Sequence, residues 1–174
     1  MILSGTQIPT IKKDELLFAK VREDAKIPSK RDEDGCYDIY ACFDDDFIII
    51  KPREIKLIPT GIASCFSSKC RLSIRERGST GSIGMSVRAG QIDSGYRNEI
   101  FVAINNTSNK DIVIKKGITD KVEYNDRIEY PYIKAIAQAA LEFVPDIIVK
   151  EVNYEELKNI PSDRGMGCLG STNN

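Results

Sequence analysis

The stretch Ala89-Gly-Gln-Ile-Asp-Ser-Gly-Tyr-Arg-Asn-Glu99 decides how the chain is interpreted. Ser94-Gly95 is typical of a tight turn, so the stretch predicts a β-hairpin with this pair between two strands. A hairpin presents backbone N–H and C=O groups in a fixed order, which can read the edge of a nucleobase. Asp93 lies at the tip and Tyr96 just after it. The alternative is a plain turn in which Asp93 caps its own backbone.

Short strands are expected on both sides of this stretch. Runs rich in β-branched and aromatic residues are separated by Gly, Pro and Asp clusters, a pattern that indicates a sandwich or barrel. One short helix is predicted at 154–159, with Asn153 as its N-cap and Pro161 beyond its end. The fold class is therefore mainly β. The predicted strands cover residues 16–21, 37–42, 47–50, 54–58, 70–74, 99–105, 111–115 and 135–143.

The bulk properties fit one globular domain. The chain has 174 residues, enough for a sizeable core. Its net charge of −1 provides no basic field that would attract nucleic acid or anionic lipid. No apolar run approaches the roughly 18 residues of a membrane span, and the first residues lack the pattern of a signal peptide. The five cysteines are odd in number and have no CxxC spacing, so we expect reduced thiols and a cytoplasmic location, host cytoplasm if the protein is viral.

Histidine is absent from the chain. Its absence excludes Ser-His-Asp and Cys-His catalysis and every His-ligated zinc site. If the protein is an enzyme, we expect a carboxylate as general base and a hard cation with oxygen ligands as any metal.

Four further segments carry groups suited to chemistry. Glu76-Arg-Gly-Ser-Thr-Gly81 offers backbone amides, hydroxyls and a guanidinium, as an anion-binding loop would, although ordinary loops share this composition. Asp34-Gly-Cys-Tyr-Asp-Ile-Tyr40 places Asp38 near a strand start, and Ala135-Ile-Ala-Gln138 is a small apolar strand ending in an amide. The tail, Arg164-Gly-Met-Gly-Cys-Leu-Gly-Ser-Thr172, has donors that suit a polyphosphate; the alternative is a frayed terminus.

Taken in their order along the chain, these segments resemble the trimeric dUTPase family. Its motifs are a GYD-like strand, an Arg-Ser-rich loop, a GVID-x-x-Y hairpin, an IAQ strand and an RGxGGFGST tail. The resemblance spans roughly residues 35 to 172. The tail departs from the pattern in having Leu169 where the family usually has phenylalanine and Cys168 where it has glycine. Gly78 separates Arg77 from Ser79, which leaves the register of the second motif open by one residue.

The resemblance implies a single-domain, jelly-roll-like β-barrel of the dUTPase type (a β-clip) and a homotrimer with shared active sites. Within the chain we expect a loose N-terminal arm at 1–14, the β domain at 15–162 and a flexible Gly-rich lid at 163–174.

The resemblance also implies an activity, dUTP diphosphatase. Members of the family hydrolyse dUTP to dUMP and pyrophosphate, which limits uracil in DNA and supplies dUMP for dTMP synthesis. Asp93 would activate the attacking water, and Mg²⁺ would bind through phosphates and water. Asp38 would be structural or would contact the metal through water. The residues implied to bind substrate are Arg77, Gly78, Ser79, Thr80, Gly90, Gln91, Ile92, Tyr96, Gln138, Arg164, Leu169, Gly170, Ser171 and Thr172.

Two alternatives remain at this point. A dCTP deaminase, or a bifunctional enzyme, shares the fold, and its Asp-Pro-Gly-aromatic hairpin is similar to Asp93-Ser-Gly-Tyr96. Deamination needs a glutamate in the following strand, but that register falls near Ala103, and Glu99 comes too early. The other alternative is a nucleotide-gated regulatory protein with an unknown partner, for which the sequence offers no motif.

Overall fold

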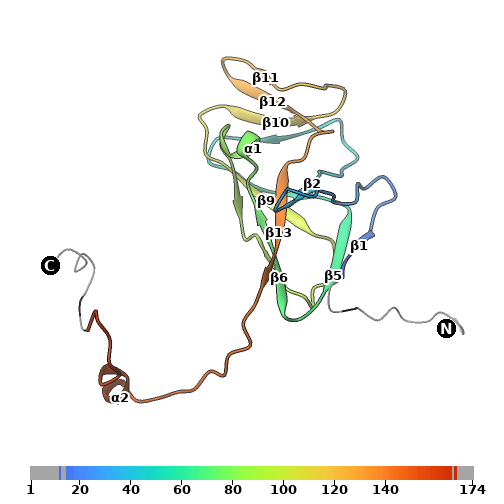
Figure 1. Cartoon of the computed structure of the whole chain (residues 1–174). Coiled ribbons are helices and arrows are strands. Elements are labelled where there is room, and N and C mark those ends of the chain that lie inside the picture. The colour runs from blue at the N-terminus through green and yellow to red at the C-terminus, as the bar shows by residue number, and fades with distance from the viewer. Residues whose placement is uncertain (1–11, 13–14, 166, 168–174) are drawn as a thin grey trace, which may run out of the picture. The chain divides into compact units, whose positions relative to one another are not determined.

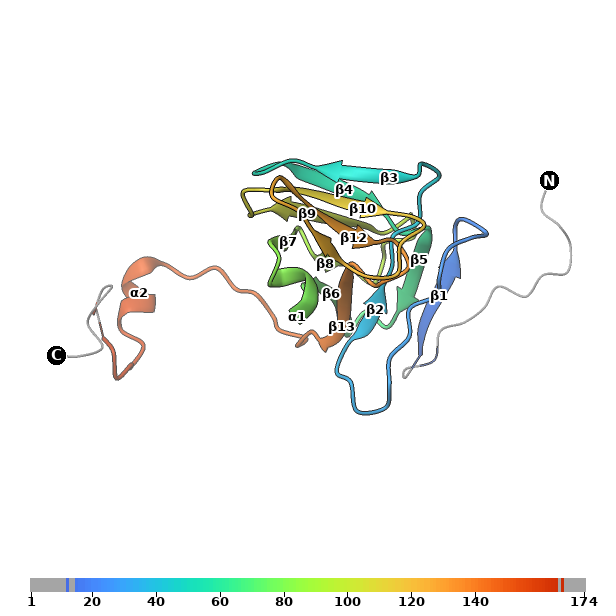
Figure 2. The same cartoon turned by 90° about the horizontal axis from the view of Figure 1, so that it is seen from above.

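The structure, a computed structural model, describes residues 12, 15–165 and 167. The chain divides into two compact units, residues 1–144 and 145–174. The strands found among the described residues all belong to the first unit, shown in two views in Figures 1 and 2. No helix in the described part of the chain has the length and apolar character needed to cross a bilayer.

The described residues of the first unit form four sheets. One pairs β1 (Leu16–Lys20) with β5 (Ile62–Phe66), and a second has the order β4-β9-β7, with bounds Ile55–Pro59, Phe101–Asn106 and Met85–Arg88. A third has the order β11-β12-β10-β3, with bounds Val122–Glu123, Arg127–Pro131, Asp111–Lys115 and Phe47–Ile50. The fourth has the order β2-β13-β6-β8, with bounds Tyr37–Ile39, Ala137–Phe143, Cys70–Arg75 and Gln91–Ile92.

The fourth sheet positions the candidate site. In Figure 1, β13 and β6 run side by side down the unit, below β10, β11 and β12. Ile39, Leu72 and Ala139 are fully buried in the core on one face. Because side chains alternate between the two faces of a strand, the opposite face carries polar residues. The register places Asp38 beside Gln138 and Gln138 beside Arg75 across three neighbouring strands.

The mainly β, jelly-roll-like prediction is confirmed. Within the described residues the strands form separate open sheets rather than one closed barrel. The second unit contains α2 (Tyr154–Lys158), close to the predicted helix, and its predicted cap is present because Asn153 Oδ1 accepts a hydrogen bond of 2.8 Å from Glu156 N.

The predicted hairpin is wrong in its pairing and right in its turn. Tyr96 N donates to Asp93 O at 3.1 Å, which closes a turn with Ser94-Gly95 at its centre. However, β8 pairs with β6, while β9 begins only at Phe101 and pairs with β4 and β7. Ile100 N donates to Ile62 O at 2.8 Å, so the chain after the turn is held by a different sheet.

Candidate active site

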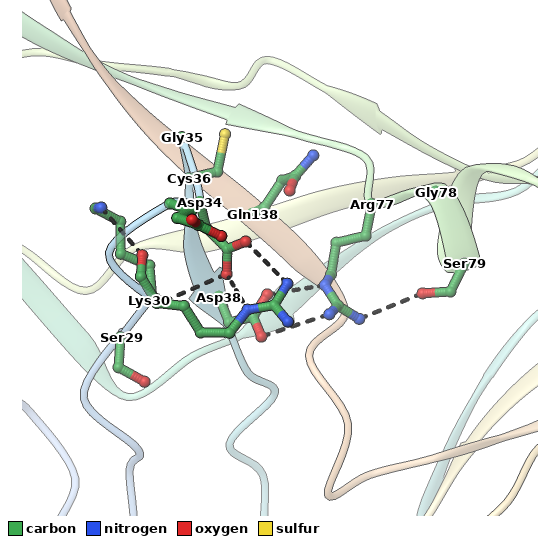
Figure 3. A pocket seen from close by; sticks show the side chains of 12 residues that line it. Ser29, Lys30, Asp34, Gly35, Cys36, Asp38, Arg77, Gly78, Ser79 and Gln138 are labelled. Carbon is green, nitrogen blue, oxygen red and sulfur yellow. Dashed lines mark hydrogen bonds and ion pairs between the residues drawn. The ribbon is translucent and has the colours of Figure 1, made fainter.

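A cavity of about 790 Å³ lies beside α1 (Gly78–Gly81). Its lining combines three of the segments selected from the sequence: the loop ending at Asp38, the Arg77–Ser79 loop and Gln138 of β13. Figure 3 shows the Arg77 guanidinium between the side chains of Asp38 and Ser79. The structure therefore brings together the first, second and fourth motifs.

Arg77 is fixed at the cavity by two neighbours. Its Nε lies 2.8 Å from Asp38 Oδ1, and its Nη1 donates to Ser79 Oγ at 3.2 Å, as the dashed lines in Figure 3 mark. The Arg77 and Asp38 side chains are 30% and 33% exposed, so solvent screens this ion pair only in part. Its Nη2 also donates to Asp38 Oδ2 at 3.4 Å, so Asp38 orients the guanidinium where it lines the cavity.

The loop before α1 takes its shape from its own hydrogen bonds. Arg77 N donates to Thr80 Oγ1 at 3.0 Å, and the Thr80 hydroxyl donates to Arg77 O at 3.2 Å. Thr80 is fully buried and does not line the cavity, in contrast to Ser79 and Gly78. The expected contact between Thr80 and a phosphate is therefore not supported, because its hydroxyl shapes the loop instead.

Glu76 and Gln138 anchor the same loop to the sheets. Gln138 Nε2 donates to Glu76 O at 2.7 Å, and Val87 N donates to Glu76 Oε1 at 2.7 Å. Burial alone would raise the pKa of Glu76, but hydrogen bonds from its own backbone, Val87 and Ser86 bring that pKa below its ordinary value. The carboxylate is therefore charged at neutral pH and ties the loop to β7.

A second, smaller cavity of about 190 Å³ adjoins the turn at Asp93. It is lined by Gln91, Ile92, Asp93, Tyr96 and Phe101. The Tyr96 hydroxyl donates to Glu99 O at 2.8 Å, which fixes its ring beside the cavity. Asp93 is exposed, and its carboxylate has no hydrogen-bond or ion-pair partner among the described residues.

Gly90 brings β8 unusually close to β6. A Cβ at this position would lie 2.3 Å from Ile74 O, so only glycine fits, and Gly90 O accepts from Ile74 N at 2.7 Å. In an antiparallel pair, successive residues direct their backbone groups to alternate sides. Since Gly90 faces β6 and β8 is the last strand of its sheet, the N–H and C=O of Gln91 face the open edge.

The predicted site residues therefore fall into two separate groups. The two cavities have no lining residue in common among the described residues. In the second unit, Arg164 Nε donates to Gly167 O at 3.1 Å. The remaining tail residues predicted to bind substrate, Leu169, Gly170, Ser171 and Thr172, lie outside the described residues.

Comparisons with known proteins identify the family. The dUTPase family model matches residues 23–119. The deoxyuridine 5'-triphosphate nucleotidohydrolase of Hydrogenobaculum sp. is 33% identical over 162 residues, which cover 91% of this chain and 97% of that protein. This chain belongs to the dUTPase family.

Solved dUTPases share the fold. The dUTPase of Staphylococcus bacteriophage 80alpha, with dUPNHPP, has a TM-score of 0.71 at 18% identity, covering 92% of this chain and 99% of that one. A mutant dUTPase from phage phi11 of S. aureus, whose structure reveals the coordination of a structural Mg(II) ion, has a TM-score of 0.64 at 18% identity, covering 82% and 99%. These similarities support the fold described above for this dUTPase.

Sequence reasoning missed part of the larger cavity of this dUTPase. Lys30, Arg31 and Glu33 also line it, and Arg31 holds Asp34, the first residue of the selected segment, through two contacts of 2.9 Å. The Arg31 guanidinium holds the pKa of the Asp34 carboxyl below its usual range. A signal was present, because the charged run 30–34 directly precedes the GYD-like strand. Phe101 at the smaller cavity was also missed, since it read as an ordinary strand residue.

Proposed function

We infer that this chain hydrolyses dUTP to dUMP and pyrophosphate. The observation that carries the inference is that one chain holds both a preformed guanidinium site at Arg77 and, in a separate cavity, the Asp93 carboxylate, which has no partner among the described residues. Both lie on motifs of the dUTPase family. The first suits phosphate groups, and the second suits activation of a water molecule.

Asp93 is the proposed general base. It would orient a water molecule and accept its proton as the water oxygen attacks the α-phosphorus. The bond to the bridging oxygen then breaks, and pyrophosphate leaves. Such a step needs alignment and charge stabilisation more than covalent help from the protein. The exposed, unpartnered carboxylate of Asp93 is consistent with this role.

The open edge of β8 is the proposed reader of uracil. The backbone of Gly90–Ile92 belongs to an edge strand, and the N–H and C=O of Gln91 face outward. One donor and one acceptor in fixed positions suit the edge of uracil. Cytosine exchanges an acceptor for a donor there, and an inverted hydrogen bond in a closed site can discriminate by a factor on the order of 10⁴.

Tyr96 is proposed to select the sugar. Its ring lines the cavity beside Asp93, and its hydroxyl is held by Glu99 O. A ring fixed in this way can pack under a deoxyribose and leave no space for a 2′-hydroxyl. UTP would then be rejected sterically.

Arg77, Gly78 and Ser79 are proposed to hold phosphates, with Gln138 nearby. Mg²⁺ would neutralise phosphate charge when it is bound with the nucleotide. The residues present fit such a cation, because the Asp38 carboxylate lines the Arg77 cavity and offers the oxygen donor that Mg²⁺ prefers. Asp38, already paired with Arg77, would contact the ion through water.

A complete site requires more than one copy of the chain. The Arg77 and Asp93 cavities are separate within one chain, and an exposed apolar face adjoins the latter. Ile55, Leu57 and Phe101 lie on one face of β4 and β9 and are 59%, 62% and 43% exposed. We propose that another copy covers this face and brings its own Arg77 cavity to Asp93, in the homotrimer that the family resemblance predicts.

The tail is proposed to complete the site. Arg164, Ser171 and Thr172 would contact the β- and γ-phosphates, and Leu169 and Gly170 would cover the base. In the second unit, Ile148 and Val149 are 82% and 93% exposed, so apolar surface is available for packing against a neighbouring copy. The cytoplasm remains the proposed location.

The alternatives gain no support. The position at which a deaminase needs its glutamate falls near Ala103, which is 7% exposed within β9. The side chain of Glu99 accepts from Gly61 N at 2.7 Å, so it is committed to the backbone. A regulatory partner stays a prediction.

Pyrophosphate release measured with dUTP, dCTP, dTTP and UTP in the presence of Mg²⁺ tests the proposal. We expect turnover of dUTP alone at a substantial rate. Comparable rates for all four nucleotides, or ammonia release from dCTP, would contradict it. Asp93→Asn is the matched control for contaminating phosphatases.

A further inference from the structure

A hydrogen-bonded network crosses the polar face of the fourth sheet, outside both cavities except at Gln91. Glu142 of β13 accepts from Arg71 Nε at 3.0 Å and from Ser73 Oγ at 2.8 Å, and its other oxygen accepts from Arg75. Ala140 lies opposite Ser73 in the ladder, and its short side chain leaves Glu142 room to reach these partners. The Glu142 side chain is 23% exposed.

The Glu142 carboxylate fixes the direction of the Ser73 hydroxyl. An ionised carboxylate only accepts hydrogen bonds, and a hydroxyl has one hydrogen to donate. The hydrogen bonds from Ser73 and Arg71 keep the pKa of Glu142 below its ordinary value, so it is ionised at neutral pH. The Ser73 hydrogen therefore goes to Glu142, and the Ser73 oxygen is left to accept.

The Ser73 oxygen, as an acceptor, in turn fixes the side-chain amide of Gln91. Gln91 Nε2 donates to Ser73 Oγ at 3.1 Å, while its Oε1 lies 3.3 Å from the same atom. Ser73 is only 1% exposed, so no solvent exchange competes at this contact. The side chain of Gln91 is thus anchored to Ser73 of β6, while the backbone of Gln91 faces the open edge of the sheet.

We propose that Glu142 is a positioning residue for base selection, acting through Ser73 and Gln91 on the β8 edge. The inference rests on the proposed function, since it assumes that this edge reads the base. Glu142 itself touches neither cavity. By holding Gln91 against β6 it restricts the orientation of the backbone groups that would discriminate uracil from cytosine. Restricting these groups before binding favours the matching base.

The test compares Glu142→Gln, Ser73→Ala and the double variant in the full-length chain. For each, kcat/KM is measured with dUTP and with dCTP, together with the thermal midpoint. Glu142→Gln preserves volume but allows the side-chain amide to donate, so the Ser73 hydrogen is no longer directed. We expect the dUTP-to-dCTP ratio of kcat/KM to fall about tenfold in each single variant. The double variant should fall no further, because both changes interrupt one pathway.

Glu129→Gln is the matched control. Glu129 is a nearly buried carboxylate with two basic partners, Arg127 at 3.1 Å and Lys115 at 3.2 Å, but it lies in the sheet of β12. The Glu129→Gln variant should have a lower thermal midpoint and an unchanged dUTP-to-dCTP ratio of kcat/KM.

Three results would overturn the inference: an unchanged ratio in Glu142→Gln, an equal loss in Glu129→Gln, or multiplied losses in the double variant. If Glu142→Gln fails to fold, Ser73→Ala decides, since it leaves the arginine pairs of Glu142 in place. A wild-type chain that does not prefer dUTP would instead overturn the proposed function.

Discussion

The candidate site has two halves, the Arg77 cavity and the Asp93 cavity, and their carboxylates differ in whether they have a partner. Asp38, in the larger cavity, is paired with Arg77 at 2.8 Å, whereas Asp93, beside the smaller one, is exposed and has no partner among the described residues. In the Arg77 half, contacts within the chain already hold the guanidinium in place, as a binding site for a phosphate anion requires. The Asp93 half keeps its reactive group open, as expected for a group that must meet water and substrate.

The largest expected effect comes from the open half. Asp93→Asn should lower kcat by roughly 10²- to 10⁴-fold while dUTP still binds, because the amide preserves shape but cannot accept the proton. Single-turnover kinetics and dUTP titration separate the two quantities. Asp120→Asn, at an exposed ion pair with Lys134, is the control and should leave turnover unchanged. Unchanged turnover in Asp93→Asn would remove this residue from the mechanism.

In the Arg77 half, substitutions of Arg77 and of Asp38 should lower activity by different amounts. Arg77→Ala removes the proposed phosphate ligand and should lower kcat/KM by roughly 10²- to 10³-fold. Asp38→Asn leaves the guanidinium present but less well oriented, and should cost on the order of tenfold. Steady-state kinetics with dUTP gives both values. An Asp38→Asn loss as large as that of Arg77→Ala would mean that Asp38 does more than orient its partner.

In the Asp93 half, substitution of Gly90 should destabilise the fold, whereas substitution of Gly95 should not. Gly90→Ala forces a Cβ to 2.3 Å from Ile74 O, so we expect it to destabilise the fold by about 2–3 kcal/mol in denaturant unfolding. Gly95→Ala, in the turn itself, meets nothing within 4 Å and should be nearly neutral. Equal stability of the two variants would contradict the close approach of β8 to β6.

The smallest effect is a pH dependence in the preformed half. The pKa of Glu76 is lower in the folded chain than its ordinary value. Its contribution to stability is therefore complete above about pH 4.3 and is lost as the pH falls through the lowered pKa. The thermal midpoints of the wild type and Glu76→Gln should differ at pH 7 and converge in acid. A constant difference across this range would show that the charge of Glu76 is irrelevant.

Much of this arrangement could be predicted from the sequence, and the exceptions have physical causes. Predicted strands 47–50 and 111–115 match β3 and β10, since uninterrupted β-branched runs leave little ambiguity. β12 was missed because Glu129 interrupts its apolar pattern, and only the ladder reveals that Arg127 and Lys115 neutralise this buried charge. Local pattern cannot foresee such long-range compensation.

The site shows the same limit. The motifs predicted Asp93, Arg77 and Gln138 as site residues, and the structure places each of them at a cavity. However, turn chemistry at Ser94-Gly95 suggested that β8 pairs with the strand that follows. Its partner is instead β6, which precedes it, because Gly90 allows a close approach to Ile74. The burial of Thr80 was likewise invisible, since a hydroxyl next to Ser79 looks the same in sequence whether it faces a cavity or its own loop.

The most direct test of a site shared between copies is to mix two inactive variants. Asp93→Asn and Arg77→Ala chains are unfolded together, refolded and assayed for pyrophosphate release from dUTP, beside each variant refolded alone. If the Asp93 turn of one copy meets the Arg77 cavity of another, about a quarter of the sites in randomly mixed oligomers combine two intact halves, and activity returns. Activity no greater than the sum of the separate variants would show that both halves must come from one chain, and would contradict the account.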